Sequence, residues 1–267
     1  MGEEINPDVV REYERETWSR CAGGYLDTFA ALTRETVPLL VEGAQIGSGS
    51  RVLEIGSGPG HVARALTESG ATVTGVDFSP QMVKVARRRF PEITFREADA
   101  EQLPFNAGSF DAVVSNFTVH HLARPEVAFR EASRVLVSGG RFAFVVWGSP
   151  EVQSSIAAFF AAVQAHHTLD ELPHGPLFGV TDRSVYERML AAAGLKGCRL
   201  TTHEVVWRCE TLEPVLRGFW DWGNMAALSQ EVQDRIETAT RENAKPFGRD
   251  GHYAFPHTVL LGRAMKP

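Results

Sequence analysis

The chain has 267 residues, of which 43% are hydrophobic and 22% are charged, and its formal net charge is −6. These values are ordinary for a globular protein with a substantial core, and the negative charge argues against nucleic acid or an anionic membrane surface as the main partner. No apolar run approaches the roughly 18 residues of a membrane span, and the acidic start is unlike a secretory signal. Three widely spaced cysteines without a CxxC pair indicate neither a disulfide framework nor a zinc site, so we expect a cytoplasmic protein without membrane insertion.

Apolar segments and helical patterns alternate along the first 150 residues. The near-continuous Val, Ile, Phe and Ala content of the apolar segments suits strands that are buried on both faces of a parallel sheet. Signals for helix starts and ends lie between these segments. Ser79 before Pro80 is an N-cap, and Gly139-Gly140 is predicted to end a helix at about 125–136. This alternation predicts a doubly wound α/β sheet, in which ligands bind beyond the carboxyl ends of the strands. The predicted strands are residues 51–56, 71–78, 93–99, 110–117 and 141–148.

Three closely spaced glycines connect the first predicted strand to a helix. Gly56, Gly58 and Gly60 have no Cβ, so the chain can turn sharply and expose its amides. The helix that begins near His61 points its positive end at whatever binds there. The segment 52–63 therefore predicts a cofactor cradle, and the alternative is a glycine-rich turn that only reverses the chain.

Polar side chains stand at the ends of the next three predicted strands: Asp77, Asp99 and Asn116. A carboxylate at the end of the second strand can accept both hydroxyls of a ribose, and a carboxylate one strand over can accept the exocyclic amine of a purine. Alone, either aspartate is more typical of a helix N-cap than of a ligand site. Together with the glycine loop, the two aspartates predict a cofactor that bears a nucleoside.

Two alignments of the glycine loop compete. Residues 58–63 match the G-x-G-x-x-G/A dinucleotide fingerprint, whereas residues 54–60 match E-x-G-x-G-x-G without adjustment. The acid at the end of the third strand, which a dinucleotide site does not need, favours the second alignment. So does the lack of any tyrosine followed four residues later by lysine. A cofactor with one nucleoside is predicted, with a nicotinamide-dependent oxidoreductase as the alternative.

Four longer segments occur in order: VLEIGSGPG, VTGVDFSPQMV, EADAEQLPFNAGSFDAVVSNFTVHHL and EASRVLVSGGRFAFVVW. In order and spacing they resemble the motifs of the class I S-adenosylmethionine-dependent methyltransferases, in particular the ubiquinone/menaquinone-biosynthesis-like (type 11) small-molecule branch. The resemblance covers residues 48–150 strongly and the rest weakly. It implies a seven-stranded Rossmann-like methyltransferase sheet of order 3-2-1-4-5-7-6, with the last strand antiparallel and helical lid insertions.

The resemblance also implies a cofactor, S-adenosyl-L-methionine, whose product is S-adenosyl-L-homocysteine. The glycine loop would hold its methionine part, and Glu54 would support the loop or bind the ammonium through water. Asp77 would take the ribose hydroxyls, and Met82 would pack on the adenine. The residues assigned to the cofactor in this way are Glu54, Gly56, Ser57, Gly58, Gly60, Asp77, Phe78, Met82, Asp99 with the amide of Ala100, Asn116 near the methionine end, and Tyr25 from the amino-terminal segment.

The remaining residues are expected to complete a single methyltransferase domain over 1–267. Apolar and polar residues alternate in 198–209 and 257–265, which predicts that these segments are the sixth and seventh strands of the sheet. A helix is predicted at 184–195. The predicted parts are a helical cover at 1–45, the cofactor-binding core at 46–150, lid insertions at 149–181 and 210–250, and the rest of the core at 182–209 and 251–267.

The segments outside the core are rich in aromatic residues. Helical elements there would fold over the strand ends as a lid, which excludes water from the reacting centre. Each aromatic residue alone is typical of core packing, whereas the group suggests an acceptor that is at least partly apolar. The residues are Trp18, Tyr25, Phe159, Phe160, Phe219, Trp220 and Trp222.

Methyl transfer requires chiefly that a nucleophile be aligned with the sulfonium, and a positioned base adds roughly 10²–10⁴-fold if the nucleophile carries a proton. His120 and His121, after the fourth strand, are candidates for that base because imidazole titrates near neutrality. The alternative is that the pair only shapes its loop. Five other histidines, His166, His167, His174, His252 and His257, are expected to be solvated, and no metal site is predicted.

The sequence thus predicts a methyltransferase that acts on a small, partly apolar organic molecule, its one expected partner. An NAD(P)-dependent oxidoreductase and a non-catalytic nucleoside-cofactor-binding protein are the alternatives. The sequence makes no prediction of the nucleophilic atom or of the oligomeric state.

Overall fold

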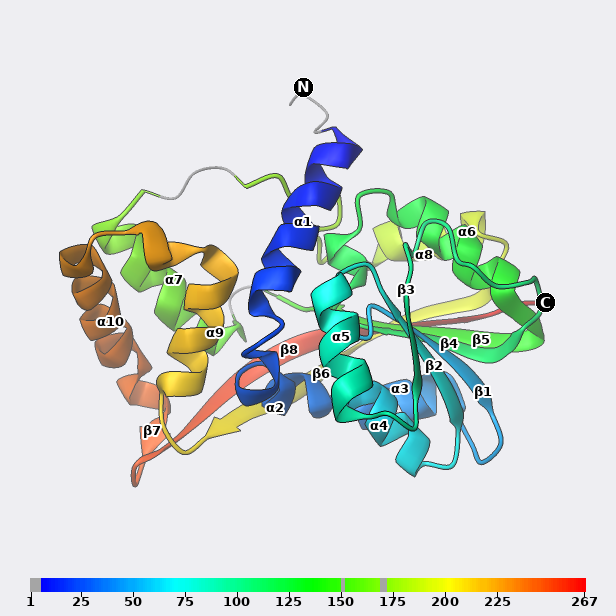
Figure 1. Cartoon of the computed structure of the whole chain (residues 1–267), viewed down its shortest axis with the longest axis horizontal. Helices are drawn as coiled ribbons and strands as arrows, with labels where there is room; N and C mark the ends of the chain where they lie inside the picture. Colours follow the sequence, from blue (N-terminus) through cyan, green and yellow to red (C-terminus); the bar gives the residue numbers. More distant parts are fainter. Residues whose placement is uncertain (1–5, 150–151, 169–171) are drawn as a thin grey trace.

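The sheet at the centre of the molecule has eight strands within the described residues: β1 (Arg51–Ile55), β2 (Thr72–Asp77), β3 (Thr94–Glu97), β4 (Phe110–Asn116), β5 (Leu136–Trp147), β6 (Lys196–Cys209), β7 (Gly248–Arg249) and β8 (His252–Met265). The structure is a computed structural model that describes residues 6–149, 152–168 and 172–267. The strand order is β3-β2-β1-β4-β5-β8-β6, with β7 paired to β8 (Figure 1). Strands β1 to β5 are parallel, and β8 is antiparallel to β5 and β6. The predicted strand order is confirmed, and β8 takes the place of the predicted seventh strand, between β5 and β6.

The α-helices of the described residues are α1 (Pro7–Cys21), α2 (Ala30–Arg34), α3 (Val37–Gly43), α4 (His61–Glu68), α5 (Pro80–Arg89), α6 (Pro125–Val135), α7 (Ser154–His166), α8 (Arg183–Ala192), α9 (Glu213–Gly223) and α10 (Gln230–Ala244). Helices α3, α4 and α5 bury their apolar side chains in one core cluster, and α6 and α8 bury theirs in another. The sheet is therefore covered on both faces, as the doubly wound prediction requires. Ser79 caps α5 as predicted, because its Oγ accepts a hydrogen bond from the amide of Met82 at 3.3 Å.

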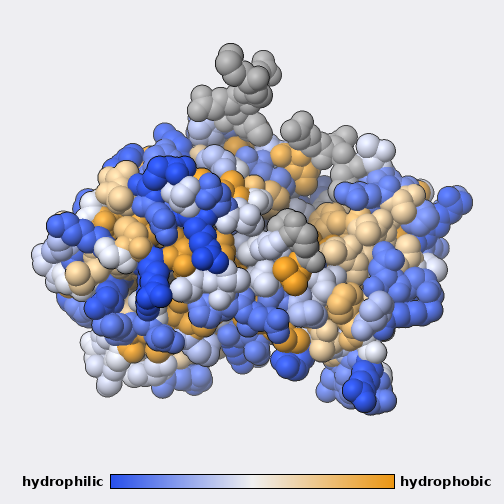
Figure 2. All heavy atoms as spheres, turned by 180° about the vertical axis from the view of Figure 1, so that it is seen from behind, coloured by the Kyte–Doolittle hydropathy of each residue, from blue (hydrophilic) through white to orange (hydrophobic). Residues whose placement is uncertain are grey.

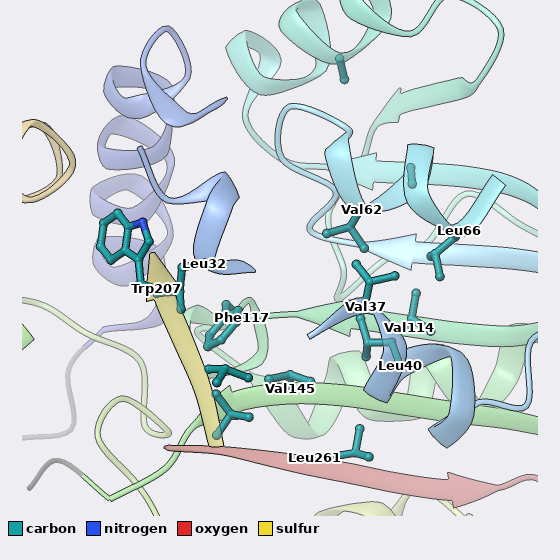
Figure 3. Packing of buried hydrophobic residues seen from close by; sticks show 14 of the residues in the cluster. Leu32, Val37, Leu40, Val62, Leu66, Val114, Phe117, Val145, Trp207 and Leu261 are labelled. Carbon is teal, nitrogen blue, oxygen red and sulfur yellow. The ribbon is translucent and has the colours of Figure 1, made fainter. Parts of the chain in front are cut away.

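The core under α3 and α4 follows from the helical period. Val62 and Leu66 lie one turn apart on α4, and Val37 and Leu40 lie one turn apart on α3, so each pair shares a helix face. Figure 3 shows these side chains packed over the central strands, where Val114 of β4 is fully buried. This packing fixes β1 and β4 beside each other and holds their carboxyl ends in one place.

The helix predicted at 125–136 is present as α6, but the prediction that Gly139-Gly140 ends it is wrong. Helix α6 ends because Leu136 is already extended (φ −70°, ψ 145°), and Gly139-Gly140 lie inside β5. Gly139 has a φ of +79°, and its amide donates to the carbonyl of Lys266 at 2.9 Å. The glycine pair therefore brings the chain into register with the end of β8 rather than closing the helix.

Helices α7, α9 and α10 form a group beyond the end of the sheet, beside the extended ends of β6 and β8 (Figure 1). Helix α1 lies between this group and α5, in contact with both α9 and α5. Within the part of the chain that the structure describes, none of the helices has the length and apolar character needed to cross a bilayer. From behind, hydrophilic side chains surround smaller hydrophobic groups (Figure 2).

Candidate active site

The glycine loop after β1 has a backbone that favours glycine at each of the three predicted positions. Gly56, Gly58 and Gly60 have φ values of +71°, +51° and +87°. A Cβ at Gly56 would lie 2.1 Å from Oγ1 of Thr118, and one at Gly60 would lie 2.6 Å from the ring of Phe95. Apart from Gly58 and its two neighbours in the chain, no atom of the described residues lies within 4 Å of the place that a Cβ of Gly58 would take. The first and third glycines allow close packing, and the second faces open space that a ligand can enter.

Alanine at the first two glycines should therefore have different effects on stability. Both positions have positive φ, which costs an alanine roughly 1–2 kcal/mol. Gly56→Ala must also displace Thr118, so we expect it to lower the free energy of unfolding by about 1–3 kcal/mol more than Gly58→Ala does. Urea denaturation of the two variants measures this difference. Equal losses would show that the contact with Thr118 imposes no requirement for glycine.

Asp77, at the carboxyl end of β2, is fixed by two backbone amides. Its Oδ2 accepts from the amide of Gly58 at 2.8 Å and its Oδ1 from the amide of Ser79 at 2.9 Å. Burial raises the pKa of Asp77 to about 6, although the amides of Ser79 and Gly58 favour its charged form. Each carboxylate oxygen keeps a lone pair for a further donor. The side chain can thus join the glycine loop to a bound hydroxyl.

Two buried polar groups beside the loop have no hydrogen-bond partner among the described residues: Oε2 of Glu54 and Oγ of Ser57. Glu54 lies on β1 and is almost fully buried. Burial and the nearby charge of Asp77 raise its pKa well above the usual range of a glutamate. Since buried polar groups are normally paired, these two atoms fit a ligand that brings an ammonium or another polar group into the loop.

Nearly all of the residues predicted to bind the cofactor line one cavity, which we call the crevice. Gly60 is the exception, because it lies at the start of α4 beneath the ring of Phe95. His121 also lines the crevice, whereas His120 does not. The predicted residues that line it are Tyr25, Glu54, Gly56, Ser57, Gly58, Asp77, Phe78, Met82, Asp99, Ala100 and Asn116.

Asn116 lines the crevice with a side chain that is already engaged. Its Oδ1 accepts from the hydroxyl of Thr36 at 2.8 Å, and its Nδ2 donates to the carbonyl of Thr33 at 2.8 Å. The side chain therefore ties the end of β4 to the segment that carries α2 and α3. Thr33 in turn hydrogen-bonds His61 of α4 at 2.8 Å.

Helix α1 covers the end of the crevice at Asp99. Arg11 on this helix forms ion pairs with Asp99, at 3.1 Å, and with Glu101. Glu101 is nearly buried and also accepts from the amide and from Nε of Arg124, at 2.9 and 2.6 Å. Neither Arg11 nor Glu101 was predicted to lie at the site. For Arg11 the reason is that α1 is rich in charged residues, and nothing local distinguishes this arginine from the others.

A second cavity of about 1280 Å³, which we call the chamber, adjoins the crevice. Its wall comes from α1, the loop after β4, α7, α9 and residues 172–181. The two cavities share part of their lining, so a molecule in the chamber would lie next to a molecule in the crevice. The shared residues are Trp18, Tyr25, Thr33, Phe117 and His121.

The two histidines proposed as bases have different surroundings in the 3₁₀ turn η2 (Val119–His121). Neither ring nitrogen of His120 has a partner among the described residues, and burial, with the charge of His121, lowers its pKa well below the usual range. Nδ1 of His121 lies 3.0 Å from Oε2 of Glu14, a side chain of α1 that is 1% exposed. His121, but not His120, thus has a carboxylate partner and faces both cavities.

Two histidines that were predicted to be solvated are not, and that prediction is wrong for them. Nδ1 of His174 lies 3.4 Å from Oε1 of Glu14. The backbone of this segment packs closely on the loop after β4, since a Cβ at Gly175 would lie 2.2 Å from the carbonyl of Leu122. His257 of β8 is fully buried and hydrogen-bonds the hydroxyl of Ser155 at 3.0 Å. Long-range packing, which leaves no local pattern, places both rings.

Comparison with known proteins gives one matching domain model and several relatives. Residues 53–144 match the model of a methyltransferase domain. The chain is 37% identical over 148 residues to the demethylmenaquinone methyltransferase of Clavibacter sepedonicus, covering 54% of this chain and 57% of that protein. It is 28% identical over 269 residues to the malonyl-[acyl-carrier protein] O-methyltransferase of Geobacter sulfurreducens, covering 95% and 98%. The chain spans about half the length of the first curated relatives that it matches.

A solved structure has the same fold. Phosphoethanolamine N-methyltransferase 2 of Haemonchus contortus, in complex with S-adenosyl-L-methionine, superposes with a TM-score of 0.56 at 22% identity. The match covers 88% of this chain and 52% of that one. At this identity the likeness concerns the fold alone.

Proposed function

We propose that this chain, which carries a class I S-adenosylmethionine-dependent methyltransferase domain, transfers the methyl group of S-adenosylmethionine to a small, partly apolar organic acceptor. The observation that carries the proposal is the junction of the two cavities. The crevice offers a nucleoside and amino-acid site, and the apolar chamber opens beside it. The relatives named above are methyltransferases, and they give no support to a nicotinamide-dependent oxidoreductase.

The residues of the crevice fit this cofactor. We assign Glu54 and Ser57, whose buried polar atoms lack partners among the described residues, to the amino-acid end beside the glycine loop. Asp77 would accept from the ribose hydroxyls. Met82 and Asp99 would lie at the adenine, and Arg11 would be the partner that Asp99 exchanges when the base binds. Tyr25, in the turn η1 (Tyr25–Asp27), would separate the cofactor from the chamber.

The bound cofactor supplies a methyl group on a sulfonium, which is a good electrophile without further activation. The chain has to exclude water and to align the acceptor with that methyl group. Of the two predicted bases we assign the role to His121, because it lies at the junction of the cavities and has Glu14 as a partner. His120 would keep a structural role in the turn.

Calorimetry with the full chain tests the cofactor, using S-adenosylmethionine, S-adenosylhomocysteine and NADH. We expect both sulfur compounds to bind and NADH not to bind. Incubation with a labelled methyl donor and a panel of phenols, quinones, amines and carboxylic acids should then show transfer. Binding of NADH without a response to the sulfur compounds would overturn the proposal, and cofactor binding without transfer to any acceptor would favour the non-catalytic alternative.

We place this activity in the cytoplasm. The three cysteines of the chain, Cys21, Cys198 and Cys209, are free thiols, and a reducing compartment preserves free thiols.

A further inference from the structure

We infer that the acceptor is a neutral aromatic compound with a hydroxyl group, that it binds in the chamber, and that Glu14 is the positioning residue that holds His121 as its base. This inference rests on the proposed methyl transfer and names the substrate class of the same site.

The carboxylate of Glu14 fixes the orientation of His121. Its two oxygens lie 3.1 and 3.0 Å from Nδ1 of His121, and Nε1 of Trp18 donates to Oε2 at 3.0 Å. When Nδ1 donates its hydrogen to a carboxylate, the lone pair of the neutral ring is on Nε2. Nε2 is then the atom of this side chain that can take a proton from a molecule at the junction of the cavities.

Glu14 is charged although it is buried. Burial raises the pKa of Glu14, but the hydrogen bonds and charges of His121 and His174 lower it by more. The net result is a pKa of about 2. A fixed carboxylate stabilises the imidazolium that forms when the ring takes up a proton. This arrangement is useful only for an acceptor that must lose a proton, and it favours a hydroxyl, whose oxygen becomes a strong nucleophile as its proton leaves.

The wall of the chamber favours a planar acceptor. The rings of His174 and Phe178 are stacked, with centroids 3.6 Å apart and planes 7° apart. The ring of Trp222 is parallel to both within 6°, with its centroid 5.9 Å from that of His174. Aligned aromatic faces bind a flat ring better than a puckered one of equal size. A planar aromatic acceptor therefore fits this wall.

The charges of the chamber favour a neutral acceptor. Apart from its histidines, the charged residues among the described lining are Glu16 and Arg20, and both are exposed. Nε of Arg20 already donates to the carbonyl of Asp221 at 2.9 Å, and its Nη2 donates to that of Trp222 at 3.3 Å. His121 and His174 of the lining already face the carboxylate of Glu14. A carboxylate or phosphate on the acceptor would thus lose water without gaining a buried cation of its own.

The proposed transfer is a single displacement at the methyl carbon. The acceptor O–H bond breaks and its proton goes to Nε2 of His121, the oxygen forms a bond to the methyl carbon, and the carbon–sulfur bond breaks with its electron pair left on sulfur. The products are an aryl methyl ether and S-adenosylhomocysteine. The proton then passes from His121 to solvent.

Four ring compounds of similar size test the acceptor class: β-naphthol, β-naphthoate, β-naphthylamine and decahydro-β-naphthol. Each is titrated by calorimetry into the full chain saturated with S-adenosylhomocysteine. We expect β-naphthol to bind at least about tenfold more tightly than the carboxylate and the saturated alcohol, and to be the methylated member of the set. Tighter binding of β-naphthoate or decahydro-β-naphthol, or methylation of the amine in preference to β-naphthol, would overturn the inference. The proposed function would survive all of these outcomes, whereas failure to bind S-adenosylhomocysteine would count against the proposed function itself.

The absorption of bound β-naphthol tests Glu14 without any turnover. Because naphtholate absorbs at longer wavelength than naphthol, the ternary complex with S-adenosylhomocysteine should show a naphtholate band at neutral pH. Glu14→Gln keeps the size and the hydrogen bond from Trp18 but removes the charge, and we expect it to lose most of this band. Glu12→Gln, an exposed position on the same helix, is the matched control and should keep the band.

Turnover should follow the same pattern. We expect Glu14→Gln to lower kcat for β-naphthol by roughly 10–100-fold, with the KM for S-adenosylmethionine unchanged. An unchanged naphtholate band in Glu14→Gln would show that this carboxylate does not position the base.

Discussion

Replacement of Asp77 by alanine should weaken the binding of S-adenosylmethionine by at least about 100-fold, since hydrogen bonds to a charged group contribute roughly 1.5–3 kcal/mol each. The substitution removes the proposed acceptor for the ribose and also the group that holds the amide of Gly58. Calorimetry with S-adenosylhomocysteine measures the loss, and circular dichroism checks that the fold is intact. Unchanged affinity would place the ribose elsewhere.

The pH dependence of binding gives a second test of Asp77. Burial raises its pKa to about 6, so the free protein protonates this carboxyl as the pH falls below that value. A protonated carboxyl accepts hydrogen bonds less well, and we expect affinity to fall by up to about tenfold per pH unit below pH 6. Asp77→Asn, which keeps the shape but does not titrate, should bind weakly and without this dependence. Glu54 lies beside Asp77, so Glu54→Gln is the control for its contribution.

Replacement of His121 by glutamine should lower turnover by roughly 10²–10⁴-fold, the usual contribution of a general base. Cofactor affinity should change little, because Asp77 and the glycine loop are untouched. The measurement is single-turnover methyl transfer to β-naphthol, or to whichever acceptor the labelled donor identifies.

His120→Phe is the companion variant. His120 lines the chamber but not the crevice, so it is not at the junction where the methyl donor and the acceptor would meet, and its ring nitrogens have no partner among the described residues. We therefore expect a loss of less than about tenfold in turnover. A larger loss at His120 than at His121 would reverse the assignment of the base.

Features that depend on local backbone could be predicted from the sequence. The positive φ values of Gly56, Gly58 and Gly60 leave glycine as the natural residue there, and a buried parallel strand leaves an unbroken apolar run. Since parallel strands end at one edge of the sheet, the positions of Asp77 and Asp99 followed from the strand prediction. These residues of the crevice could therefore be predicted from the sequence alone.

Features that depend on packing between distant segments could not be predicted. Glu14 and His121 are 107 residues apart in the sequence, and Glu14 and His174 are 160 apart. Helix α1 is rich in charged residues, so a buried glutamate within it looks like any other charge on a solvated helix. Gly139 illustrates the same point, because its partner Lys266 lies at the other end of the chain and decides whether the glycine ends a helix or enters a strand.

Helix α1 carries Arg11, Glu14 and Trp18 at intervals of three and four residues, and so on one face. The first contacts Asp99, the second contacts His121 and the third lies in the wall between the two cavities. A displacement of this helix would therefore break the contact at Asp99 and the contact at His121 together. One helix face thus joins the cover of the crevice to the partner of the proposed base, so the two sites are coupled through a single element.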